Sequence, residues 1–113
     1  MKLFIPPLGT RLRLTKDWQF SLLCEERNKT LWNLVTGRAP MERIPVLHRR
    51  GQAAMVHLHK DDELTVDRIF IRKLESNYDS ITFKGVVHHN GVFCRVRFWV
   101  PLMYANQMEV EII

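Results

Sequence analysis

The side chains best suited to chemistry in this chain are arginines and aromatic rings that recur at every second position. Guanidinium groups bind phosphates and carboxylates, and aromatic rings stack on unpaired bases or anchor protein interfaces. The set consists of Arg68, Phe70, Arg72, Lys84, Phe93, Arg95, Arg97 and Trp99. Because a spacing of two puts side chains on one face of a β-strand, these residues form one surface if their segments are neighbouring strands.

The dipeptide Asn90-Gly91 predicts how two of these segments pair. Asn-Gly between apolar-rich runs is typical of a type I′ β-hairpin, whose two-residue turn fixes the register of both strands. His89 then faces Val92, and the pairing runs on to Thr82 opposite Trp99. One face collects Phe83, Gly85, Val87, Cys94, Val96 and Phe98 as a core, and the other collects Lys84, His88, Phe93, Arg95, Arg97 and Trp99.

The preceding segment extends this cationic and aromatic face to a third strand. Arg68, Phe70 and Arg72 share one side, and Ile69 with Ile71 is expected to join the core. Lys84 and Arg97 are placed directly opposite each other, which is unfavourable without compensation from a polyanion or from nearby acids. The acids that could neutralise the face are Asp67, Asp79, Glu109 and Glu111.

A second basic feature is an irregular connection over residues 38–52. It contains Pro40, Pro45 and Gly51 without any sustained period, and its arginines are Arg38, Arg43, Arg49 and Arg50. Residues 1–56 carry ten Lys or Arg against four Asp or Glu, whereas residues 57–113 carry seven against eight. A basic segment of this kind is suited to polyanions, although it is also typical of a solvated loop.

Metal binding and catalysis have weaker signals. His57 and His59 lie two apart, so both could reach one metal ion, but zinc sites usually gather three or four ligands. Asp61, Asp62 and Glu63 are consecutive, whereas metal-dependent nucleases bring carboxylates together from separate elements. These acids are typical of a solvated turn, and no phosphate-binding loop or nucleophile elbow is present. We therefore expect no enzyme activity, no metal and no cofactor.

The 113 residues predict one compact domain over 1–113, with 46% hydrophobic and 26% charged residues. We expect a mostly β fold, a small antiparallel meander that closes into a curved sheet or barrel, with one short helix. The predicted helix passes through Leu31 and Val35, begins at Asn28 or Thr30 and ends at Gly37. Strands are predicted over residues 3–5, 10–14, 18–24, 54–60, 64–73, the two hairpin segments and 108–113.

Cys24 and Cys94 are expected to be reduced core thiols, because two cysteines without a partner pattern define neither a disulfide scaffold nor a zinc site. The start of the chain is broken by Pro6-Pro7 too early for a signal peptide, and no run approaches the length of a membrane span. We expect a cytoplasmic protein without membrane contact.

The combination predicts a small module that binds RNA or single-stranded DNA through the basic and aromatic sheet face and the basic connection. The alternative is a protein-interaction module, a regulator or inhibitor of a nucleic-acid-processing enzyme or of another acidic partner, because Trp, Phe and Arg also dominate protein interfaces. A metal-dependent nuclease that uses Asp61, Asp62, Glu63 and the histidines is a third, weaker alternative.

Overall fold

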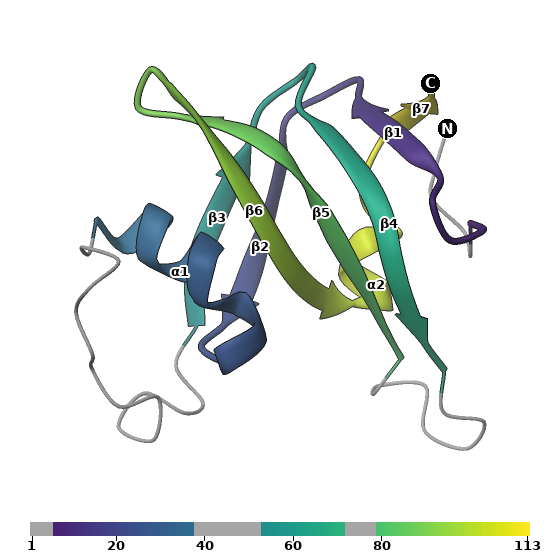
Figure 1. Cartoon of the computed structure of the whole chain (residues 1–113), viewed down its shortest axis with the longest axis horizontal. Coiled ribbons are helices and arrows are strands. Elements are labelled where there is room, and N and C mark those ends of the chain that lie inside the picture. Colours follow the sequence, from purple (N-terminus) through teal and green to yellow (C-terminus); the bar gives the residue numbers. More distant parts are fainter. Residues whose placement is uncertain (1–5, 38–52, 72–78) are drawn as a thin grey trace.

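The fold is organised around the hairpin at Asn90-Gly91, as seen in a computed structural model that describes residues 6–37, 53–71 and 79–113 (Figure 1). The predicted strand over 3–5, the basic connection over 38–52 with Arg43, Arg49 and Arg50, and Arg72 lie outside the described residues. Within the described ranges, neither helix has the length and apolar content needed to cross a membrane.

Seven strands and three short helical segments follow one another along the described part of the chain. They are β1 (Arg11–Leu14), β2 (Trp18–Leu23), the 3-10 helix η1 (Glu26–Asn28), α1 (Lys29–Thr36), β3 (Ala53–Leu58), β4 (Glu63–Phe70), β5 (Ser80–His89), β6 (Val92–Pro101), α2 (Leu102–Ala105) and β7 (Val110–Ile112). The prediction of a mostly β, antiparallel fold is confirmed. A single helical turn, α2, follows Pro101.

The strands form two antiparallel sheets, one in the order β6-β5-β4-β1-β7 and one of β2 with β3. The meander is therefore confirmed only for β4, β5 and β6. β1 and β2 are consecutive in the chain but belong to different sheets, and β1 lies between β4 and β7. Alternation in a sequence shows which face of a strand is buried, but it does not show which strand is its neighbour.

The predicted register of β5 and β6 is confirmed at every pair from His89–Val92 to Thr82–Trp99. Asn90 and Gly91 have φ values of 50° and 80°, the left-handed pair that a type I′ turn requires. Phe83, Val87, Val96 and Phe98 of the predicted core face are buried, and Cys94 is half-buried. The hairpin thus has one face in the core and one face outside it.

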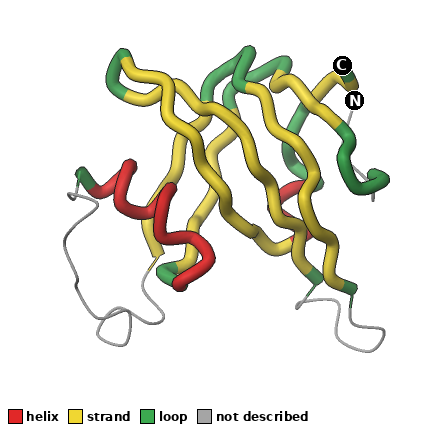
Figure 2. The backbone as a smooth tube through the Cα atoms, in the orientation of Figure 1, coloured by secondary structure: helices red, strands yellow, loops and turns green. Residues whose placement is uncertain are grey.

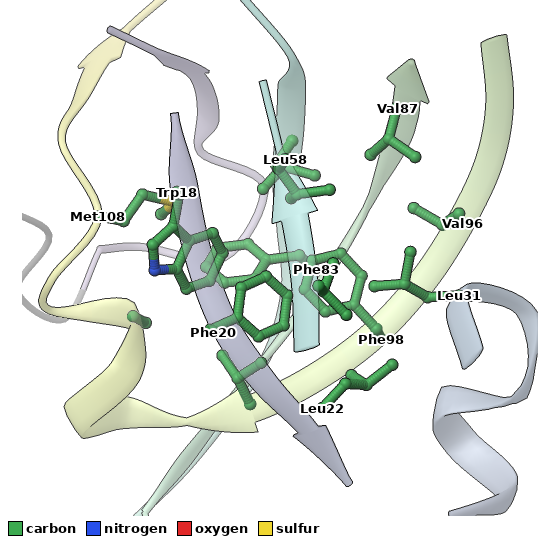
Figure 3. Close-up of a cluster of buried hydrophobic side chains, with 14 of the residues drawn as sticks. Trp18, Phe20, Leu22, Leu31, Leu58, Phe83, Val87, Val96, Phe98 and Met108 are labelled. Carbon is green, nitrogen blue, oxygen red and sulfur yellow. The ribbon is translucent and has the colours of Figure 1, made fainter. Parts of the chain in front are cut away.

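The core joins the two sheets through aromatic contacts (Figure 3). Phe98 lies 5.8 Å from Phe83 of the same sheet and 5.6 Å from Phe20 of β2, measured between ring centroids. Trp18 stacks on Phe20 with their centroids 4.1 Å apart. Leu31 of α1 is also fully buried, and α1 lies at one side of the strands against β3 and β6 (Figure 2).

α1 begins and ends where the sequence predicted, but the side chain at its start has a different role from the one expected. Gly37 has φ 69° and closes the helix with a bond from its N–H to the Asn33 carbonyl. Asn28 occupies the position before the helix, yet its side chain makes no capping bond. Its buried amide instead donates from Nδ2 to the Leu23 carbonyl at 3.0 Å and accepts the Trp99 backbone N–H at Oδ1 at 2.7 Å. The amide therefore ties the helical segment to the edge strand β6.

Replacing Phe98→Ala is expected to lower the free energy of unfolding by about 3–5 kcal/mol, because it empties a fully buried site between the two sheets. Urea unfolding measures this change. Phe93→Ala, on the same strand but on the outer face, is the matched control and should change the free energy of unfolding much less. An unchanged midpoint for Phe98→Ala would contradict the face assignment.

Candidate binding surface

The candidate surface is the outer face of β4, β5 and β6, the side of the larger sheet that is turned away from the core. All of the predicted sheet-face residues except Arg72, which is not described, lie on it. Arg68, Phe70, Lys84, Phe93, Arg95 and Arg97 are exposed, and Trp99 is half-buried. The pairs Lys84–Arg97 and His88–Phe93 are directly opposite each other, as the register predicted.

A bulge in β4 adds an acid to the centre of this face. Val66 pairs with Phe83 and Arg68 pairs with Thr82, so Asp67 is an extra residue in the ladder. In such a bulge two residues oppose one, which brings Asp67 to the outer face beside Arg68. The Asp67 carboxylate lies 3.0 Å from Arg97 Nε and 3.7 Å from Lys84 Nζ.

Asp67 resolves the repulsion expected between Lys84 and Arg97. The hydrogen bond from Arg97 is the largest cause that lowers the pKa of the Asp67 carboxyl below its ordinary 3.8, and the nearby charges of Arg97 and Lys84 lower it further. Partial burial acts in the opposite direction and is outweighed. The compensation for the opposed cations is thus supplied within the sheet by one acid.

Trp99 is held by the helical segment rather than presented as an open ring. Its Nε1–H donates to Glu25 Oε2 at 2.9 Å, and the guanidinium carbon of Arg27 lies 5.2 Å from the ring centroid. Strand alternation predicted an exposed stacking platform at this position. Glu25 and Arg27 cover it because η1 packs against β6, a contact between distant segments that alternation does not reveal.

One exposed part of the face lies near the hairpin turn. The side chain of Phe93 is 74% exposed, and Val86 beside it is also exposed. The His88 and Phe93 rings are in contact, with centroids 5.0 Å apart, and Arg95 lies opposite Val86. We call Val86, His88, Phe93 and Arg95 the hairpin patch. Within the described part of the chain, no acid pairs with Arg95 in an ion pair.

Arg68 and Phe70 lie at the other end of the outer face, where β4 pairs with the first residues of β5. Phe70 is 53% exposed and Arg68 is exposed. Arg68 likewise has no acidic ion-pair partner among residues 6–37, 53–71 and 79–113. The outer face therefore has two exposed basic and aromatic ends, with the Asp67 ion pairs between them.

Asp62, one of the three consecutive acids, has a structural role. Its buried carboxylate accepts the backbone N–H of His59 at Oδ2, at 2.9 Å, and that of His88 at Oδ1, at 3.2 Å. Glu63 pairs with Arg11, with 3.8 Å between the charged atoms. Asp62 thus ties the turn between β3 and β4 to β5, and it does not converge with Glu63 on a common point.

The histidines form a row of rings near the same turn. The His57 and His59 centroids are 5.5 Å apart, and His59 and His88 are 6.0 Å apart. His57 Nε2 lies 3.5 Å from an Asp17 carboxylate oxygen. No group of three or more His, Cys, Asp or Glu among the described residues is placed to hold a metal ion.

Comparison of the chain with protein-family models, curated proteins and solved structures gave no match. The ligands that the surface could bind are therefore inferred from the geometry of its side chains alone. Three residues that shape it, Glu25, Arg27 and Asn28, carried no sequence signal for that role, because each acts on β6 from a distant segment.

Replacing Arg97→Gln is expected to raise the pKa of Asp67 toward 3.8, because it removes the largest cause of the lowered value. An NMR titration of the carboxyl carbon measures this. Since the folded-state pKa is the lower one, the pair stabilises the fold above the unfolded-state pKa, and that stability is lost as the pH falls through the folded-state pKa. Arg11→Gln, which removes the partner of Glu63, is the control. The same Asp67 pKa in wild type and Arg97→Gln would contradict the assignment.

Proposed function

We propose that this protein binds RNA or single-stranded DNA through the outer face, with the hairpin patch as its main contact. The observation that carries the proposal is the pairing of an exposed aromatic ring, Phe93, with an arginine that has no ion-pair partner in the described structure, Arg95, on one strand face. Unpaired bases stack on aromatic rings, and arginines attract the phosphates between the bases.

Cations extend this contact along β5 and β6. Lys84 and Arg97 lie next to Arg95 on the outer face, and both are exposed although they share Asp67. When a nucleic acid binds, its phosphates would replace the Asp67 carboxylate as the partner of Lys84 and Arg97. Asp67 therefore lowers the affinity of the surface for polyanions and keeps Lys84 and Arg97 in place when no ligand is bound.

The basic connection with Arg43, Arg49 and Arg50, together with Arg72, belongs to the same proposal as additional phosphate contacts. A cytoplasmic location is also part of it, supported by two cysteines that are both free. Closure of the strands into a curved sheet or barrel is the third part of the proposal, and the contacts of α1 with both β3 and β6 support it.

Fluorescence anisotropy titrations with labelled 12-nucleotide RNA and DNA at two salt concentrations test the proposal. Phe93→Ala should cost roughly 1–3 kcal/mol of binding free energy with little change in the salt slope, because it removes stacking. Arg95→Ala should make the salt slope shallower by about one unit, because it removes one phosphate contact. Ser21→Ala, on the other sheet, is a control that should change neither. No binding at the lower salt concentration would overturn the proposal.

Replacing Asp67→Asn is expected to tighten oligonucleotide binding and to steepen its salt dependence, because it releases Lys84 and Arg97 for phosphates. The same titrations measure both quantities. Glu63→Gln, which releases only Arg11, is the matched control and should have the smaller effect. Weaker binding by Asp67→Asn would show that the ion pairs position the ligand rather than compete with it.

The second candidate function is a protein-interaction module that regulates or inhibits an acidic partner. The observation that favours it is the apolar character of the hairpin end, where Val86, Val92 and Phe93 are all exposed. Exposed apolar side chains beside arginine are typical of the centres of protein interfaces. Capture of a defined partner that survives nuclease treatment and is lost in Phe93→Ala would favour this function over the first.

A further inference from the structure

β6 is an edge strand whose backbone offers pairing groups on its outer side. The Trp99 N–H bonds to Asn28 rather than to β5, so it points away from the sheet. Along an antiparallel pair, residues whose backbone groups bond to the neighbouring strand alternate with residues whose backbone groups point away from it. The backbone groups of Phe93, Arg95 and Arg97 therefore point away from β5, as those of Trp99 do. Pro101, two residues after Trp99, also has its nitrogen on the side away from β5. Proline lacks an N–H group, so at this position no hydrogen bond between β5 and β6 is lost.

The outer backbone groups near the hairpin are unpaired within the described structure. Trp99 is capped by Asn28, but no described residue forms a hydrogen bond with the backbone N–H or C=O of Arg95 or Arg97 on the side away from β5. Such an edge is a template for another extended chain. The length that is free, from Phe93 to Arg97, suits a short peptide segment.

A groove runs beside this edge, between β6 and α1. Its end near the hairpin has a volume of about 460 Å³ and apolar walls that include Leu34, Val92, Cys94 and Val96. Its other end is polar and is lined by Arg27, Lys29 and Arg97 with one acid, Glu26. Thr30 and Asn33 line both ends, so the two ends lie next to each other along β6.

We propose that this groove binds an extended, acidic peptide segment of a protein partner, which adds to the larger sheet as a strand next to β6. Successive side chains of such a segment point to opposite faces. One set enters the apolar end of the groove, on the side of Cys94 and Val96, and is apolar. The other set lies on the outer face beside Arg95 and Arg97 and is acidic.

Two features of the site select a peptide. Only a peptide backbone carries the alternating N–H and C=O groups that pair with Arg95 and Arg97, and this pairing is the basis of recognition by strand addition. The apolar walls accept hydrocarbon side chains but not phosphates. The basic rim of Arg27, Lys29, Arg95 and Arg97 favours acidic side chains, and within this rim Arg97 already pairs with Asp67 and Arg27 with Glu25. The inference does not depend on nucleic-acid binding.

The test begins with selection of ten-residue peptides from a random displayed library on the full chain. The selected sequences should alternate apolar residues with Asp or Glu. For the strongest synthetic peptide, amide hydrogen exchange should slow at Arg95 and Arg97, where new backbone bonds form, and the exchange rate at Val96, which already pairs with β5, should change less.

Two substitutions separate strand addition from attraction between charges. Arg95→Pro removes the outward N–H together with the charge, whereas Arg95→Ala removes the charge alone. Arg95→Pro should therefore bind the peptide roughly 3- to 10-fold more weakly than Arg95→Ala. Thr30→Trp fills the middle of the groove and should abolish binding. Gln19→Trp, at an exposed position on β2, is its control and should bind as the wild type does.

Thermal unfolding shows whether each variant is folded. If Arg95→Pro does not fold, Thr30→Trp and the exchange rates of the wild-type complex decide the result. Failure to enrich any peptide, selected sequences without acidic residues, or full binding by Thr30→Trp would each overturn the proposal. Peptide binding without slowed exchange at Arg95 and Arg97 would also overturn it, because the peptide would then bind by side chains alone.

Discussion

The buried amide of Asn28 is the interaction on which the arrangement around β6 depends. It holds the Leu23 carbonyl at the end of β2 and the Trp99 N–H on β6 at the same time, so it joins the two sheets outside the apolar core. A lost partner would leave a buried polar group unsatisfied, at a cost of about 1–3 kcal/mol. With Asn28 in place, η1 brings Glu25 and Arg27 to Trp99, and α1 starts where Leu31 can enter the core.

One strand, β6, therefore contributes to both proposed binding sites. Its side chains form the hairpin patch, and its backbone edge forms one wall of the groove. Arg95 and Arg97 belong to both, because their side chains lie on the outer face while their backbone groups point toward the groove. A nucleic acid and an acidic peptide would then compete for the same guanidinium groups. If both ligands bind, each lowers the apparent affinity of the protein for the other.

The sequence predicted the features that depend on neighbouring residues. Asn90-Gly91 and Gly37 require left-handed backbone, and both ended their elements as expected. The face assignment of β5 and β6 followed from the turn. The bulge at Asp67 was missed because a single extra residue leaves no pattern in the sequence. Strand alternation could not show whether Trp99 is covered, because Glu25, which holds its ring, lies 74 residues away in the chain. The position of β1 was missed because its neighbours β4 and β7 are both distant in the chain.

The place of β1 between β4 and β7 has a consequence for the order in which the fold forms. β5 and β6 are joined by a two-residue turn, so their pairing closes a very short loop, whereas Arg13 must find Glu111 near the other end of the chain. Closing a longer loop costs more entropy, and folds rich in distant pairings fold slowly. We therefore expect the hairpin to form early in folding and β7 to be added late. β7 has only three residues and lies at the open edge of the larger sheet. We therefore expect it to be the first strand to separate when the protein unfolds.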